Sequence, residues 1–246
     1  MRAATFDEQP GHEIFSESER RAWHALFERH FGKGNGRKAL DLASGTGVIS
    51  HLMHDLGFDV TGMDWSEAML EKARAKSGQR GSNITFLLGD AENTLEADNS
   101  YDVIITRHLV WTLVDPAAAF AEWFRVIKPG GKLLVVDGDF VSPTWATKFN
   151  KAMAGFLETL GLRKPVVPVA HMQTHHDILA RVHFSNGARA DDVKAMLAQT
   201  GFESIAVDVD LKQIHSAQKK HISFAKGLER GAQHRYAICA QKPASI

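Results

Sequence analysis

The chain has 246 residues, of which 44% are hydrophobic and 24% charged, the balance of an ordinary globular domain. Lys and Arg together number 29, as do Asp and Glu, so the formal net charge is zero, which argues against a general nucleic-acid-binding protein because such proteins carry a basic face. One cysteine excludes a disulfide within the chain, and we find neither a signal-peptide pattern nor an apolar run of membrane-spanning length. We therefore expect a soluble, cytoplasmic protein with no nucleic-acid or membrane partner.

Strand-like and helix-like segments alternate from about residue 38 onward, which predicts a parallel sheet with crossover helices. A helix precedes the sheet, because Ser16 and Glu19 have the spacing of a capping box and an apolar helical pattern follows them up to Gly32. Five strands are expected in the first part of the chain, at residues 38–42, 58–63, 84–88, 101–106 and 132–137.

The alternation stops between residues 139 and 187, and we interpret this segment as an insertion that caps the sheet. Ser142 and Pro143 open a helix in it whose aromatic face, with Trp145 and Phe149, is expected to form the packed core of the cap. The sheet pattern then resumes with a helix ending at Gly201 and strands at 205–211 and 234–241. The polar link between these strands shows no clear amphipathic helix, so we expect a hairpin with an antiparallel last strand.

These elements predict a single domain in four parts. They are an N-terminal helical segment (1–35), a cofactor-binding core (36–138), the cap insertion (139–187) and the C-terminal part of the sheet (188–246).

Glycine or carboxylate residues follow three consecutive predicted strands. The first strand runs into a loop that contains Gly45 and Gly47, the second ends in Asp64, and the third is followed by Asp90 and Ala91. Ligands of open α/β sheets bind at the carboxyl ends of strands, where glycines let a ligand approach the backbone and helix N-termini favour an anionic group. Asp64 is placed to accept both ribose hydroxyls, and the third loop is placed to meet an adenine ring. The sequence therefore predicts a nucleoside cofactor.

The spacing favours S-adenosylmethionine over a dinucleotide. The dinucleotide fingerprint G-x-G-x-x-G requires a third glycine where this chain has Ser50. The acidic residue upstream of the loop, Asp41, and the segment GDAE at 89–92 are also not expected of a dinucleotide site.

Residues 36–138 resemble the class I S-adenosylmethionine-dependent methyltransferases of the small-molecule type. The motifs that carry the resemblance are DLASGTG (41–47), Asp64, GDAE (89–92), YDVIITRHLVW (101–111) and RVIKPGGKLLVVD (125–137). The resemblance implies a Rossmann-like, doubly wound, mostly parallel sheet of seven strands with an antiparallel last strand. It also implies S-adenosylmethionine as the cofactor, with the binding residues Ala43, Ser44, Gly45, Gly47, Asp64, Trp65, Asp90, Ala91 and Arg107. One departure is Ala43, which stands where the family has the first glycine of the loop.

The residues after the fourth strand are expected to face the transferred methyl group. His108 is the candidate catalytic residue, as a base or as a group that orients the acceptor, with a purely structural histidine as the alternative. Trp111 is expected to form an apolar wall for the substrate, with core packing as the alternative. The motif [DNS]-P-P-[YFW] of enzymes that methylate nucleic-acid bases is missing here, and together with the zero net charge this favours a small-molecule acceptor.

Three histidines of the insertion, His171, His175 and His176, are expected either to line the substrate pocket or to lie on the surface. A metal site is not expected, because no carboxylate pattern such as H-E-x-x-H and no second thiol accompanies them. The alternatives left open are methylation of a nucleic acid or protein and a non-catalytic accessory protein that binds S-adenosylmethionine.

Overall fold

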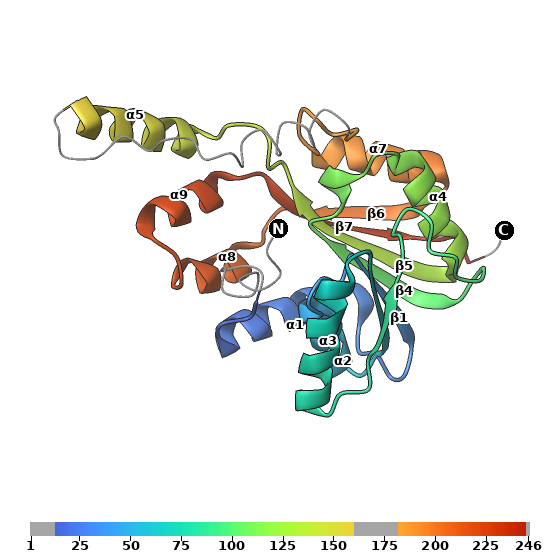
Figure 1. The fold of residues 1–246 in the computed structure, drawn as a ribbon. Coiled ribbons are helices and arrows are strands. Elements are labelled where there is room, and N and C mark those ends of the chain that lie inside the picture. Colours follow the sequence, from blue (N-terminus) through green and yellow to red (C-terminus); the bar gives the residue numbers. More distant parts are fainter. Residues whose placement is uncertain (1–12, 160–181, 245–246) are drawn as a thin grey trace.

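A sheet of seven strands forms the centre of the protein (Figure 1), which we describe from a computed structural model over residues 13–159 and 182–244. The strands are β1 (Lys38–Leu42), β2 (Asp59–Asp64), β3 (Thr85–Leu88), β4 (Tyr101–Arg107), β5 (Ile127–Gly138), β6 (Glu203–Asp208) and β7 (Arg235–Gln241), in the spatial order β3-β2-β1-β4-β5-β7-β6. Strands β1 to β5 run parallel, and β7 is antiparallel to both of its neighbours. The doubly wound sheet with an antiparallel last strand is confirmed.

Helices cover both faces of the sheet (Figure 1). One face packs against α1 (Glu17–Phe31), α2 (Val48–Asp55) and the start of α8 (Lys212–Lys219), and the other against α4 (Pro116–Val126) and α7 (Ala190–Thr200). Helix α3 (Glu67–Arg80) packs on β3 through Leu70, Ala73 and Phe86. Strands β1, β4 and β5 are therefore buried on both sides, which explains their continuous apolar sequences.

Local signals in the sequence account for the ends of the helices that lead to the site. The Ser16 side chain accepts a hydrogen bond from the Glu19 amide at 3.2 Å, so the predicted cap of α1 is confirmed. Asp115 caps α4 through the Ala118 amide at 3.0 Å, and Pro116 occupies the first turn.

The segment between β6 and β7 differs from the prediction. It contains the two short helices α8 and α9 (Phe224–Ala232), where the sequence indicated a polar link without a helix. Both helices are short, with eight and nine residues, and α9 contains Gly227 and Gly231, which lower its helix propensity. The prediction of a hairpin-like antiparallel pair is nevertheless confirmed, because β6 and β7 are neighbours.

The helix expected at the start of the insertion is α5 (Trp145–Thr159), and it contacts α9. Trp145 and Phe149 do not form the packed core that was expected, since Trp145 is 64% and Phe149 52% exposed. Trp145, Phe149 and Met153 form a stripe at helical spacing that lies on the open side of the helix.

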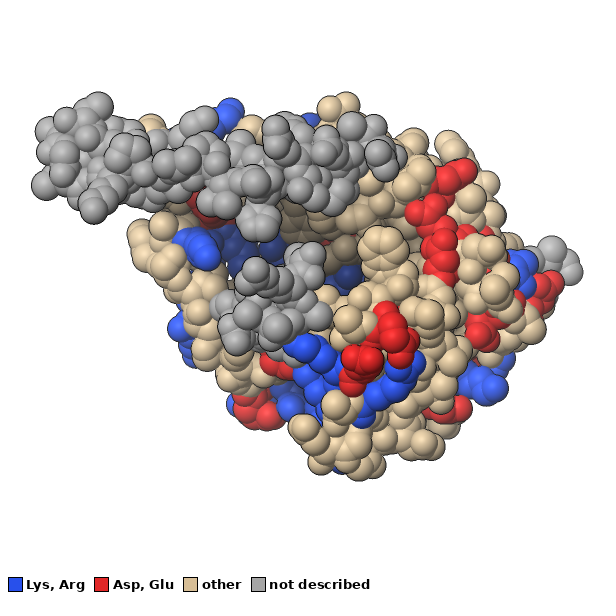
Figure 2. All heavy atoms as spheres, viewed as in Figure 1, with Lys and Arg blue, Asp and Glu red and all other residues tan. Residues whose placement is uncertain are grey.

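Tan surface occupies much of the described part of the face shown in Figure 2, and the acidic and basic side chains there form separate small groups. No helix within the described residues is both long and apolar enough to cross a membrane.

Candidate active site

The loop after β1 turns the chain tightly into α2. Ala43, Gly45 and Gly47 all have positive φ angles, of 57°, 57° and 81°. At Gly47 a glycine is required for a second reason, because a Cβ atom there would lie 2.9 Å from Cζ of Phe86. The loop therefore brings backbone amides to the carboxyl edge of the sheet with no side chain from either glycine in the way.

Asp64, the last residue of β2, ties this loop to the next one. Its Oδ2 accepts a hydrogen bond from the Gly45 amide at 2.8 Å, and its Oδ1 accepts one from the Ser66 amide at 2.9 Å. Burial raises the pKa of Asp64, and the hydrogen bonds from Ser66 and Gly45 oppose that shift. Each carboxylate oxygen can accept a further hydrogen bond, so the group both stabilises the loop and remains able to accept hydroxyl groups.

The edge after β2 and β3 carries unusually exposed apolar side chains. Trp65 is 86% exposed and Leu88, the last residue of β3, is 60% exposed. The exposed Asp90 accepts a hydrogen bond from the Glu92 amide at 2.9 Å, and the Ala91 carbonyl accepts one from Nε1 of the buried Trp123 at 2.7 Å. Leu88 was not among the residues predicted from the sequence, although an apolar residue at the strand end before Gly89 is a signal that could have indicated it.

Asp41 and Arg107 lie behind the loop, at the ends of β1 and β4. Oδ2 of Asp41 accepts a hydrogen bond from Oγ of Ser50 at 2.6 Å. Burial raises the pKa of Asp41 to about 7, while the Ser50 hydroxyl and the Arg107 charge act in the opposite direction. The Arg107 guanidinium lies over the Trp23 ring at 5.5 Å from its centroid, so its side chain points toward α1.

An aromatic cluster follows β4 and β5. The His108 and Phe140 ring centroids lie 5.0 Å apart, and those of Trp111 and Phe140 lie 5.9 Å apart. Trp111 donates from Nε1 to the His108 carbonyl at 3.1 Å. His108 has a φ of 61°, a strained conformation for a residue other than glycine and one that is frequent at functional sites. The sequence analysis did not identify Phe140, which becomes a neighbour of His108 only through the pairing of β4 with β5.

Known proteins resemble the chain in both sequence and fold. Residues 40–135 match a family model described as a methyltransferase domain. A solved phosphoethanolamine N-methyltransferase 2 from Haemonchus contortus, in complex with S-adenosyl-L-methionine, superposes with a TM-score of 0.66 at 18% identity and covers 98% of this chain and 56% of that one. A demethylmenaquinone methyltransferase from Renibacterium salmoninarum is 32% identical over 171 residues, which is 68% of this chain and 70% of that protein.

The chain belongs to the class I S-adenosylmethionine-dependent methyltransferases. A ubiquinone/menaquinone biosynthesis C-methyltransferase from Bdellovibrio bacteriovorus is also 32% identical, over 162 residues that cover 65% of this chain and 68% of that protein. The protein is therefore an S-adenosylmethionine-dependent enzyme that methylates a small molecule.

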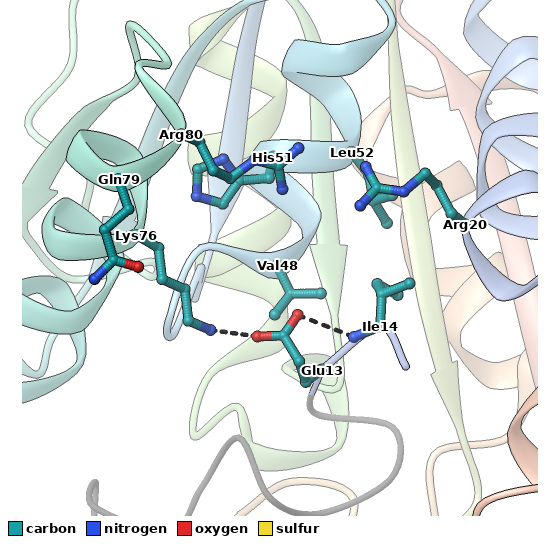
Figure 3. A pocket seen from close by; sticks show the side chains of 9 residues that line it. All are labelled: Glu13, Ile14, Arg20, Val48, His51, Leu52, Lys76, Gln79 and Arg80. Carbon is teal, nitrogen blue, oxygen red and sulfur yellow. Dashed lines mark hydrogen bonds and ion pairs between the residues drawn. The ribbon is translucent and has the colours of Figure 1, made fainter. Parts of the chain in front are cut away.

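A hollow of this methyltransferase lies among α1, α2 and α3 (Figure 3). Glu13 accepts a hydrogen bond from Nζ of Lys76 at 2.5 Å across its mouth, and Lys76 also donates to Oγ1 of Thr46 at 3.2 Å. Burial lowers the pKa of His51 in its wall to about 4. None of the residues that follow β2 to β5 lines this hollow, so we do not assign the acceptor to it.

Asp137, near the end of β5, is a buried carboxyl that the sequence analysis did not identify. Its Oδ2 accepts a hydrogen bond from the Val110 amide at 2.7 Å, and its Oδ1 accepts one from the Gly138 amide at 2.9 Å. Burial raises the pKa of Asp137 to about 7 against these hydrogen bonds. It thereby fixes the turn that carries Val110 and Trp111.

The remaining predicted residues of the methyltransferase site, His171, His175 and His176, lie outside the described residues. Within the described residues, no group of three His, Cys, Asp or Glu side chains is arranged to bind a metal ion.

Proposed function

We propose that the methyltransferase binds S-adenosylmethionine across the ends of β1, β2 and β3 and methylates an acceptor held over the ends of β4 and β5. The observation that supports this division is the meeting of the loops after all five strands at one edge of the sheet, with Asp64 on one side and the His108 cluster on the other.

The residues present suit the cofactor. Asp64 retains acceptor capacity for two ribose hydroxyls, since each of its oxygens receives one backbone hydrogen bond. Trp65 and Leu88 offer exposed apolar surface for an adenine ring near Asp90 and Ala91. Gly45 and Gly47 place no side chain on the loop at the start of α2, so the methionine moiety can approach the loop backbone next to Ala43 and Ser44.

Methyl transfer demands alignment more than acid–base chemistry. When bound, the cofactor supplies an activated methyl group that the acceptor displaces in line. His108, Trp111 and Phe140 would form the wall that orients the acceptor and excludes water. His108 would also take up a proton from an acceptor that arrives protonated.

The aromatic wall suits an acceptor with a planar ring, because aromatic pairs stack or meet edge to face. Relatives named for demethylmenaquinone support the same choice. We therefore propose a ring-bearing acceptor and use demethylmenaquinol as the first compound in the assay below.

The test has a binding arm and a turnover arm. A ligand at about 100 times its dissociation constant stabilises a fold by about 2.7 kcal/mol, so S-adenosylhomocysteine is expected to raise the melting temperature and NAD is not. Formation of S-adenosylhomocysteine is then measured with demethylmenaquinol and with fractions of a cell extract as acceptors. Stabilisation by NAD alone would contradict the cofactor assignment, and cofactor binding without turnover on any fraction would favour the accessory protein.

A further inference from the structure

Strand β5 holds the chain that follows β4 at two points. The amide of His108, the first residue after β4, donates a hydrogen bond to the carbonyl of Val136 on β5 at 3.0 Å. Two residues later, the Val110 amide donates to Oδ2 of Asp137 at 2.7 Å, and the Trp111 amide donates to the same oxygen at 3.4 Å. Because β4 and β5 are neighbours in the centre of the sheet (Figure 1), these contacts attach the segment to a rigid part of the fold.

The backbone conformation of His108 explains why two points of attachment are needed. Its φ of 61° lies in the left-handed region, which residues other than glycine adopt at a cost in strain. Such strain persists only where the surrounding structure holds the backbone in place. Val136 and Asp137 hold the chain on the two sides of this turn, so β5 supplies the restraint.

Asp137 takes the place of a helix cap at this turn. A short 3₁₀-helix, Val110–Thr112, begins directly after Leu109, whose side chain has no oxygen that could accept from the first amides of the helix. The carboxyl group of Asp137 accepts from them instead, across from the neighbouring strand. The position is costly for a carboxyl group, since Asp137 is 2% exposed and burial raises its pKa to about 7. Strained backbone and a buried titratable group are both typical of functional sites.

Two side chains of the proposed acceptor wall depend on this segment. The Trp111 indole donates from Nε1 to the His108 carbonyl at 3.1 Å, so the two residues are linked. The His108 imidazole lies against Phe140, with ring centroids 5.0 Å apart. Phe140 also contacts β7, because the Arg235 guanidinium lies 5.1 Å from its ring centroid. Relaxation of the backbone at His108 would therefore move the imidazole relative to a ring that has other contacts.

We infer that Asp137 is a positioning residue for methyl transfer, which keeps His108 in the left-handed conformation that places its imidazole at the acceptor. The inference rests on the proposed function, since it takes the acceptor to lie over the ends of β4 and β5. Because Asp137 acts through His108, the effect of Asp137→Asn on turnover should disappear once the imidazole is removed. A carboxyl group that only stabilises the fold would change turnover equally with and without the imidazole.

The first measurement is turnover of demethylmenaquinol, and Tyr236→Phe is the matched control for Asp137→Asn. Tyr236 pairs with Asp137 across β5 and β7, and its hydroxyl donates to the Ala188 carbonyl at 3.1 Å, so the control also removes a buried hydrogen bond. At about pH 8, above the pKa of Asp137, turnover should fall about tenfold or more in Asp137→Asn and less than about twofold in Tyr236→Phe. In a His108→Asn background, Asp137→Asn should lower turnover further by less than about twofold. Asp137→Ser, which removes the carboxyl group with a smaller polar side chain, is a second variant with the same expectations.

The second measurement needs no acceptor. In the protein saturated with S-adenosylhomocysteine, the NMR signals of the His108 ring protons are identified by their absence in His108→Asn. Their chemical shifts report the nearby Phe140 ring, because an aromatic ring shifts the signals of protons that lie close to it. We expect these signals to move toward the values of a free histidine in Asp137→Asn and to keep their positions in Tyr236→Phe.

Two results would overturn the inference. Unchanged His108 signals in Asp137→Asn would show that the carboxyl group does not position the imidazole. A loss of turnover of the same size with and without the His108 imidazole would assign a purely structural role to Asp137. Failure of the proposed function is distinguishable, because the unsubstituted protein would then not turn over demethylmenaquinol, while the His108 signals would still show whether Asp137 positions the imidazole.

Discussion

The proposed cofactor and acceptor sites form two halves of one edge of the sheet, at the carboxyl ends of β1 to β5, and the two halves are built in different ways. The proposed cofactor half consists of short loops directly after β1, β2 and β3, connected by hydrogen bonds such as that from the Gly45 amide to the Asp64 side chain. The proposed acceptor half gathers long side chains from segments far apart in the chain, from Trp23 of α1 to Arg235 of β7. The cofactor half can therefore remain constant while the acceptor half changes, which agrees with one fold serving many acceptors.

The largest effect is expected on cofactor affinity, when Asp64 of the cofactor half is substituted. Asp64→Ala removes an acceptor of two hydroxyl groups, and each hydrogen bond to a charged group contributes about 1.5–3 kcal/mol. We expect the affinity for S-adenosylhomocysteine to fall about 100-fold or more, as measured by calorimetry. The stability should also fall, because the Gly45 and Ser66 amides lose their acceptors.

Asp64→Asn is the matched control, because it retains one acceptor oxygen and should give an intermediate loss of affinity. Unchanged affinity in Asp64→Ala would show that the end of β2 does not contact the ribose.

The second prediction compares the pH dependence of stability that arises from the buried carboxyl groups of the two halves, Asp41 and Asp137. Asp41 has a pKa of about 7 in the folded state against about 3.8 when unfolded, so the folded state binds its proton more tightly. Its contribution to stability is therefore lost as the pH rises from about 4 to about 7, by up to about 1.4 kcal/mol per pH unit. The asparagine in Asp41→Asn does not titrate. The free energy of unfolding of this variant, measured with urea at pH 5, 6 and 7, should therefore rise relative to that of the parent protein as the pH rises.

Asp137→Asn should start from a lower stability, because the asparagine retains one acceptor oxygen for the Val110 and Gly138 amides and should lose about 1–3 kcal/mol at pH 5. Burial also raises the pKa of Asp137 to about 7, so this loss should shrink as the pH rises toward 7. A stability difference between Asp41→Asn and the parent that does not vary with pH would refute the protonated state of Asp41.

The third prediction concerns turnover in the acceptor half. His108→Asn preserves the positive φ, which asparagine tolerates well, and removes the imidazole. We expect turnover to fall about tenfold or more, as typical of acid–base and positioning groups, with less than a threefold change in S-adenosylhomocysteine affinity. Trp111→Ala should behave similarly. A loss of cofactor affinity equal to the loss of turnover would show that the two halves are not separable at β4.

The smallest effect is expected at Ala43. The φ of 57° at Ala43 costs about 1–2 kcal/mol of backbone strain, which a glycine would not have. Glycine offsets part of this gain, because its unfolded chain has greater conformational freedom. Ala43→Gly should therefore raise the free energy of unfolding by up to about 1 kcal/mol, with cofactor affinity within threefold. Urea denaturation is the measurement, and a clear destabilisation would mean that the methyl group of Ala43 packs in the loop.

The difference between the halves also explains what could be predicted from the sequence. The loop at 43–47 and Asp64 follow from local patterns, because each lies at the end of a clear strand. The positions of Phe140 and Asp137 beside His108 depend on the register of β4 and β5, which a sequence does not display. Helices α8 and α9 were missed because each is too short to be stable alone and depends on contacts with α1 and α5.

The reversed direction of β7 has a further consequence for how acceptor preference can diversify. Because β7 runs against β5 and β6, the connection from Asp208 to Arg235 both leaves and re-enters the sheet at the edge where the cofactor loops lie. Residues 209–234 thus form one connection, and the neighbouring strands β6 and β7 hold its two ends. Grafting residues 209–234 between related methyltransferases is therefore a direct test of whether this connection determines acceptor selectivity.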